Sequence, residues 1–159
     1  MKLFLKRIVL LTMLTISVSL IFVHEAPAPP ILPNVCSVST SGLVFGIYTP
    51  RQVAPLDAVT YASIVCTAGT AFLLGMDNGI YYQDSWRRSR NGLQYLNYQI
   101  YLDNSRSQVW GMTPGVNMLS GIGTGAQQNI PVYGRIPALQ EPTDGSYGDT
   151  ITVTVEYMP

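Results

Sequence analysis

The feature that most constrains this sequence is the regular alternation of apolar and polar residues in two segments, Tyr95 to Leu102 and Ile151 to Tyr157. Successive side chains of a β-strand point to opposite faces, so an alternation with period two is typical of a half-buried strand. The apolar faces consist of Leu96, Tyr98, Ile100 and Leu102 in the first segment and of Ile151, Val153, Val155 and Tyr157 in the second. Both segments are therefore predicted to be strands.

Shorter apolar segments between Gly- and Pro-rich stretches predict the other strands. The chain has 14 Gly, 11 Pro and 10 Tyr, a composition that favours short strands joined by turns. We expect a first strand over 36–48, broken at Ser41–Gly42, and further strands over 59–66, 71–76, 109–110 and 130–136, the last kept near a sheet edge by Pro131. Loops and turns are expected over 50–55, 77–92, 111–126 and 145–148. No useful amphipathic helix is found, which indicates an all-β sandwich.

The N-terminal residues are organised as an export signal. Lys2, Lys6 and Arg7 precede an uncharged apolar run, Ile8 to Val23, and small residues follow around Ala26. These are the parts of a secretory signal peptide, although a retained membrane anchor remains an alternative. The expected organisation is a signal peptide over 1–26, a Pro-rich extension over 27–35 and one β domain over 36–159.

The two cysteines, Cys36 and Cys66, both lie after this signal. An even number of cysteines in an oxidising compartment indicates a disulfide. Closing a loop of about 30 residues would contribute roughly 3–4 kcal/mol in the chain-entropy model. Two free, buried thiols are the alternative.

The residue types that carry enzyme chemistry are scarce. The only histidine, His24, lies at the end of the signal, so a Ser-His-Asp or Cys-His arrangement cannot be built in the domain. There is no zinc-ligand spacing and no Gly-rich phosphate loop. The formal net charge of zero gives no indication of a nucleic-acid partner. We therefore expect no enzyme activity, no metal, no cofactor and no small-molecule substrate.

Three weaker features have both a functional and an ordinary interpretation. Asp144 and Asp149 flank a short turn and could form a carboxylate pair, but turn caps are the favoured interpretation. The arginine run at 87–90 could bind an anion, but a solvated loop is favoured. The ten tyrosines could form a sugar-binding platform, but tyrosines of a sandwich more often fill its core or cover its strands.

Several segments, in order, resemble a known family. They are Phe45-Gly46-x-Tyr48 after a Cys-containing first strand, Cys66-Thr67, Leu96 to Asp103, Val109-Trp110-Gly111, Tyr133 to Gln140 and Gly145 to Tyr157. This ordered set, which runs from Cys36 to Tyr157, resembles the spore coat protein U domain family, which includes subunits of archaic (Csu-type) chaperone–usher pili.

The resemblance implies an incomplete immunoglobulin-like β-sandwich that lacks its final strand. A strand donated first by a periplasmic chaperone, and then by a neighbouring pilus subunit at an outer-membrane usher, would fill the gap. The resemblance maps the disulfide onto Cys36 and Cys66. The groove for the donated strand would be lined by the first strand at Val38, Leu43 and Phe45 and by the last strand at Ile151, Val153 and Val155.

Three functions follow as candidates. The chain is expected to be an exported structural or adhesive pilus subunit that passes through the periplasm to the cell surface and serves cell adhesion and biofilm formation. A secreted coat or matrix protein with the same fold and a self-sufficient surface-binding module are the alternatives. Because four of residues 27–35 are prolines, which lack the N–H that an inserted strand donates, we expect a tip or terminal subunit that accepts a strand without donating one. The apolar residues of the 111–126 loop would offer it adhesive contacts.

Overall fold

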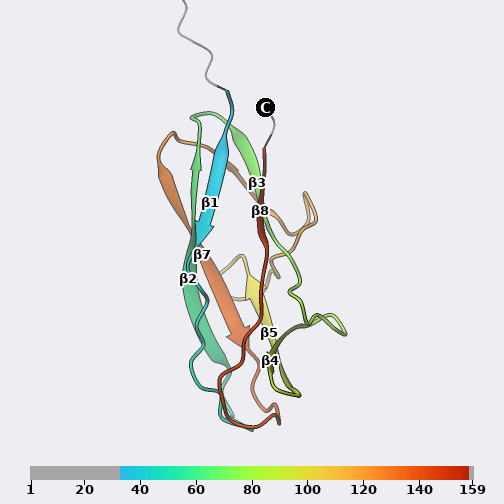
Figure 1. Cartoon of the computed structure of the whole chain (residues 1–159). Helices are drawn as coiled ribbons and strands as arrows, with labels where there is room; N and C mark the ends of the chain where they lie inside the picture. Colours follow the sequence, from blue (N-terminus) through green and yellow to red (C-terminus); the bar gives the residue numbers. More distant parts are fainter. Residues whose placement is uncertain (1–32, 158–159) are drawn as a thin grey trace, which may run out of the picture. The chain divides into compact units, whose positions relative to one another are not determined.

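Residues 33–157 are described by the computed structural model, and they form two antiparallel β-sheets (Figure 1). One sheet has the strand order β1-β2-β7-β5-β4, and the other has the order β6-β3-β8. The strands are β1 (Cys36–Thr40), β2 (Leu56–Cys66), β3 (Ala71–Met76), β4 (Arg87–Asn91), β5 (Gln94–Tyr101), β6 (Leu119–Ile122), β7 (Gln127–Ile136) and β8 (Val153–Tyr157). The predicted all-β, immunoglobulin-like sandwich is thus confirmed.

This described part of the chain has no helix, and hence none that could cross a membrane. The predicted signal peptide, 1–26, and most of the Pro-rich extension lie outside the described residues.

The core forms between the sheets because each strand buries alternate residues. On β2, Ala62 and Ile64 are buried, whereas Val59, Tyr61 and Val65 are exposed on the outer face. The buried inner positions of β5 are the apolar ones of the predicted alternation. The alternation in 95–102 therefore gave the correct inner face of β5.

Cys36 lies directly opposite Cys66 in the ladder between β1 and β2, and the two are joined by a disulfide. The predicted bond is present, and the described residues contain no free cysteine. It fastens the start of β1 to the end of β2.

The expected first strand over 36–48 is only half correct. β1 ends at Thr40, and after Ser41 residues 42–47 continue beside the sheet without backbone hydrogen bonds to it. Gly46 has φ +84°, outside the extended region, which interrupts any strand here. The chain regains a partner at Tyr48, which forms an isolated bridge with Gly145.

The arginine run at 87–90 is also not the solvated loop expected. Residues 87–91 form β4, which pairs with β5 in register, Arg87 opposite Tyr98 and Asn91 opposite Gln94. Arg87 is fully buried and donates hydrogen bonds to backbone carbonyls. A strand forms without apolar residues because the buried guanidinium is satisfied by hydrogen bonds.

Three smaller expectations need correction. The 111–126 loop contains β6, which pairs with β3, and within it Met118 is buried. Val109 forms only an isolated bridge, to Tyr101, instead of a strand over 109–110. The predicted turn at 145–148 is not a turn: Gly145 and Gly148 each form an isolated bridge, to Tyr48 and to Arg90.

Pro131 lies in β7, which is an interior strand of its sheet and not an edge strand. The proline is nevertheless tolerated because β5 pairs only with Tyr133–Arg135 of β7. At the level of Pro131, β7 has β2 as its single neighbour, so one side of the backbone needs no ladder partner.

Candidate functional site: an apolar groove between two free sheet edges

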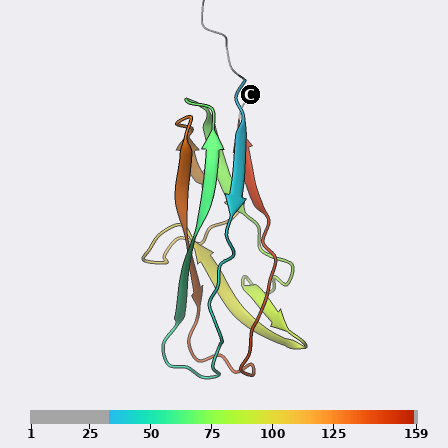
Figure 2. The same ribbon diagram turned by 60° about the vertical axis from the view of Figure 1, so that its left-hand side comes forward.

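β1 and β8 lie side by side but do not pair with each other (Figures 1 and 2). β1 is the outermost strand of its sheet and pairs only with β2, and β8 is the outermost strand of its sheet and pairs only with β3. One edge of each sheet therefore has backbone N–H and C=O groups that face no neighbouring strand.

An apolar groove of about 520 Å³ opens below these two edges. Its walls are residues 40–48, which follow β1, and residues 146–153, which lead into β8. Its floor comes from the inner faces of β5 and β7 and consists of Leu96, Tyr98, Ile100, Val132 and Ile136. All five floor residues are almost completely buried, so the groove reaches the core of the sandwich.

Gly134 of β7 gives the groove much of its form. A Cβ atom at this position would lie 2.5 Å from Leu43 Cδ2 and 2.6 Å from Phe45 Cζ, too close for any real contact. The missing side chain lets Leu43 and Phe45 pack directly against the sheet. Phe45 also makes an edge-to-face contact with Tyr98, with 6.0 Å between ring centroids.

The backbone of residues 42–47 makes no hydrogen bond to any other residue of the part that the structure describes. Val44 is 78% exposed and Ile47 is 74% exposed on the same segment. This wall thus has apolar side chains in solvent as well as free backbone groups, a combination that usually marks an interaction surface.

The structure brings together four of the six residues expected to line the groove. The groove is lined by Leu43, Phe45, Ile151 and Val153. Val38 and Val155 pack against the core but do not line the groove. The sequence analysis missed the floor, although the alternation in 95–102 already identified the buried face of β5. Which strand would cover that face was not visible in a local pattern.

The lower end of the groove is held by polar contacts. The Tyr48 hydroxyl donates to the Gln140 carbonyl at 3.0 Å and accepts from the Gln140 N–H at 3.1 Å. The Gln140 side-chain amide pairs with both backbone groups of Asn97, each at 2.9 Å, like a short additional strand beside β5. Gln140, the last residue of the Tyr133 to Gln140 segment, is therefore a structural residue that connects Tyr48 with β5.

Asp149 is a structural residue and does not form the carboxylate pair considered with Asp144. Its carboxylate accepts from the Tyr98 hydroxyl at 2.7 Å and from the Ile80 backbone N–H at 3.2 Å. Burial, followed by this hydrogen bond to a charged acceptor, raises the pKa of Tyr98 far above its ordinary value. Tyr98 is therefore a neutral hydrogen-bond donor, and the contact links β5 to the segment before β8.

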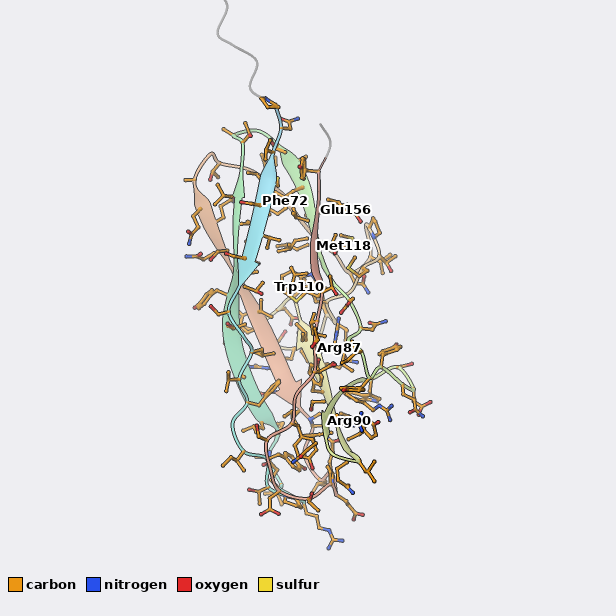
Figure 3. The ribbon with its side chains drawn as sticks, in the orientation of Figure 1. Phe72, Arg87, Arg90, Trp110, Met118 and Glu156 are labelled. Atoms are coloured by element: carbon orange, nitrogen blue, oxygen red, sulfur yellow. A yellow bond between two sulfur atoms is a disulfide. The ribbon has the colours of Figure 1, made fainter. Side chains whose placement is uncertain are left out.

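Arg87, on the inner face of β4, joins the two sheets (Figure 3). Its Nη2 donates to the carbonyls of Met76, Asp77 and Trp110 at 3.0, 2.6 and 2.7 Å, and its Nη1 donates to Gln99 Oε1 at 3.1 Å. Burial lowers the pKa of this guanidinium, although an arginine stays charged under all ordinary conditions. Within residues 33–157 no group of three or more potential metal ligands is found.

These features define a class: an immunoglobulin-like β-sandwich that is open along one edge and has an apolar groove in the opening. Comparison with known proteins identifies the family. The model of the Spore Coat Protein U domain matches residues 25–154, and the chain belongs to this family. The chain is 30% identical, over 139 residues, to Protein U of Myxococcus xanthus, and this match covers 77% of each chain.

A solved structure gives the same assignment of the fold. The chain is similar to one chain of the CsuC–CsuE chaperone–tip adhesion subunit pre-assembly complex from the archaic chaperone–usher Csu pili of Acinetobacter baumannii. The TM-score is 0.58 and the sequence identity is 26%; the match covers 78% of this chain. It spans only 40% of the length of the matched chain.

Proposed function

We propose that this protein is an exported structural subunit of a surface pilus, built by the chaperone–usher route, and that it accepts a donated β-strand in the groove between residues 40–48, which follow β1, and residues 146–153, which lead into β8. The observation that carries the proposal is the 520 Å³ groove with an apolar floor, which continues from the unpaired edges of β1 and β8. The family membership and the likeness to a protein of a chaperone–subunit complex support it.

The physical argument is that an inserted strand supplies two things that the groove lacks. Its backbone would pair with the free edges, and its alternate side chains would enter the apolar space above Leu96, Ile100 and Val132. Each apolar side chain that becomes buried contributes about 1.5–3 kcal/mol, before the entropy cost of ordering the strand. A few such side chains are enough for a stable complex.

The partners follow from this mechanism. A periplasmic chaperone would occupy the groove first, and a neighbouring subunit would replace it at an outer-membrane usher. The uncharged run at 8–23 would direct export as part of a signal peptide over 1–26, followed by the extension 27–35 and the domain 36–159. The role of such a subunit is mechanical and adhesive, and no catalysis is proposed.

We further propose a tip or terminal position. Residues 27–33 include four prolines, which cannot donate a backbone hydrogen bond to a neighbour's groove. The end of the extension is also held by its own domain: Thr67 Oγ1 donates to the Pro33 carbonyl at 3.1 Å, and the Thr67 N–H donates to the Val35 carbonyl at 2.9 Å. Both features disfavour this extension as a donor strand.

The decisive experiment measures thermal unfolding of the exported chain with and without a synthetic peptide of alternating Val, Ile and Thr. Filling the groove should raise the melting temperature substantially. The matched control peptide has its inward residues replaced by Ser, and it should have no effect. In the chain, I151D/V153D places two charges on the groove wall and should abolish the response.

A stable monomer whose melting temperature no donor peptide changes would refute strand acceptance. For the position, complementation of a strand-deficient subunit by a peptide of residues 27–35, or antibody labelling along the whole fibre, would refute the terminal assignment.

A secreted coat protein is the second candidate function, and the match to the Spore Coat Protein U domain is the observation that favours it. The same groove would then connect subunits of a coat. Neighbouring genes for a periplasmic chaperone and an outer-membrane usher would favour the pilus, and their absence would favour the coat.

A further inference from the structure

β4 has two chemically different faces. Arg87 and Ser89 point inward, and Ser89 lines the groove, whereas Arg88 and Arg90 occupy the alternate positions on the outer face. Tyr95, opposite Arg90 on β5, lies on the same outer face and is 38% exposed. The function proposed above uses none of these outward residues.

The outward arginines stack on two tyrosines. The Arg88 guanidinium carbon lies 4.4 Å from the centre of the Tyr95 ring, and that of Arg90 lies 5.6 Å from the Tyr81 ring and 6.0 Å from the Tyr95 ring. The two rings contact each other edge to face, at 5.8 Å. These four residues are called the Arg–Tyr cluster.

In each of the two guanidinium groups, only the Nε atom donates a hydrogen bond to the described part of the chain. Arg88 Nε donates to the Tyr81 carbonyl at 2.8 Å, and Arg90 Nε donates to the Gly92 carbonyl. Within residues 33–157, the Nη atoms of both arginines have no hydrogen-bond acceptor and neither arginine has an acidic partner. Ring stacking and the Nε bonds thus hold two guanidinium groups in place while four N–H-bearing nitrogens stay available.

The Arg–Tyr cluster stands out against the negative charge of the rest of the domain. Residues 33–157 contain six arginines and eight acidic residues, a net charge of 6 − 8 = −2. Three of the other arginines are paired with carboxylates, Arg51 with Glu141 and both Arg106 and Arg135 with Asp57, and Arg87 is buried. The Arg–Tyr cluster therefore carries the positive charge that has no carboxylate partner and is not fully buried, in a domain whose net charge is negative.

We propose that the Arg–Tyr cluster binds an acidic polysaccharide through its carboxylate or sulfate groups. Guanidinium groups bind such oxyanions through two parallel hydrogen bonds. Outward positions on one strand repeat about every 7 Å, so Arg88 and Arg90 can bind two anionic groups of one polymer. The exposed side chains of Ile80, Tyr82 and Leu93 on the adjoining loops add flat and apolar surface for sugar rings.

This site is compatible with an occupied groove. The cluster and the groove lie on opposite faces of β4 and β5, and no member of the cluster lines the groove. A strand in the groove would leave the cluster exposed, so the inference does not depend on strand donation and can be tested separately.

The test uses the full chain, exported to the periplasm and purified from it, and measures binding to immobilised hyaluronate (carboxylate), dextran sulfate (sulfate) and neutral dextran. We expect binding to at least one anionic polymer, no binding to dextran, and weaker binding at high salt. R88Q/R90Q should lower the affinity about tenfold or more. R88K/R90K keeps both charges but loses the planar fork, and should also bind more weakly than the native chain.

Arg51→Gln is the matched control, because it removes an exposed arginine outside the cluster and should leave binding unchanged. Binding of only one of the two anionic polymers would support the proposal and identify the anion. Unchanged binding of R88Q/R90Q, an equal loss in R51Q, or equal binding of dextran would overturn it. Tighter binding of single-stranded DNA than of either polysaccharide would also overturn it, in favour of a phosphate polymer.

Discussion

Replacement of Arg87 by Met should destabilise the domain more than any surface substitution on the same strand. Arg87 is 0% exposed and satisfies four buried acceptors: the carbonyls of Met76, Asp77 and Trp110, and the side-chain oxygen of Gln99. Met has a similar length and fills most of the space, so the main effect is the loss of hydrogen bonds and not the opening of a cavity.

The expected magnitude follows from the acceptors that remain. A buried polar group without a partner costs about 1–3 kcal/mol, and the release of a desolvated charge offsets part of this cost. If two of the four acceptors find no water, the free energy of unfolding falls by about 4 kcal/mol. With a urea m-value of about 2 kcal/mol/M, the midpoint moves by about 2 M.

Trp110 reports on this unfolding, because its indole is fully buried and its carbonyl is one of the four acceptors. Urea titrations of the exported chain, followed by tryptophan fluorescence, would compare Arg87→Met with Arg88→Met. The neighbouring arginine lies on the outer face, so Arg88→Met should change the midpoint by less than about 0.5 M. Equal shifts in the two variants, or a small shift in Arg87→Met, would refute the role given to the buried arginine.

Three further substitutions test other parts of the structure. Replacing Cys36 and Cys66 together by Ala should lower the free energy of unfolding by about 3–4 kcal/mol, measured by urea titration against the oxidised chain. Gly134→Ala should cost about 1–3 kcal/mol and weaken peptide binding in the groove, because the new methyl displaces two wall side chains, whereas Gly148→Ala meets open space and should be close to neutral. The hydrogen bond from Arg135 lowers the pKa of Asp57 in the folded chain below the ordinary 3.8. The ion pair therefore contributes to the free energy of unfolding above pH 3.8, and this contribution is lost as the pH falls through the pKa of the folded chain. Asp57→Asn should therefore reduce the difference in urea midpoint between about pH 7 and about pH 3, and an unchanged difference would argue against this ion pair.

Two kinds of local pattern predicted strands correctly: the alternation in β5 and β8, and the short apolar run that forms β3. In β5 the apolar period marks both the strand and its buried face, whereas in β8 Val153 and Val155 are only partly buried and Tyr157 is exposed. β4 was missed because Arg87 and Ser89, which face inward, look like loop residues until their hydrogen-bond acceptors are known. β6 was missed because Gly121 weakens the local signal, and its lack of a side chain makes sense only once the Phe72 ring is seen against it.

The candidate site, too, could be predicted only in part from local sequence patterns. The resemblance named six wall residues, and four of them, among them Leu43 and Ile151, line the groove of the structure. The floor depends on which strands of the five-stranded sheet lie beneath the walls, which is a property of topology and not of any one segment. The outer Arg–Tyr cluster likewise requires the register of β4 with β5.

The position of the Cys36–Cys66 bond determines how the domain would carry mechanical load. A pull on the residues that precede β1 passes the hydrogen bonds of Pro33 and Val35 to Thr67 and then reaches Cys36, at the end of the antiparallel ladder where unzipping of β1 from β2 would begin. The covalent bond at that end passes the force directly into β2, which is paired along most of its length with β7. β1 then remains in place while the load is shared by the interior of the sheet, and the groove wall beside it keeps its form under tension.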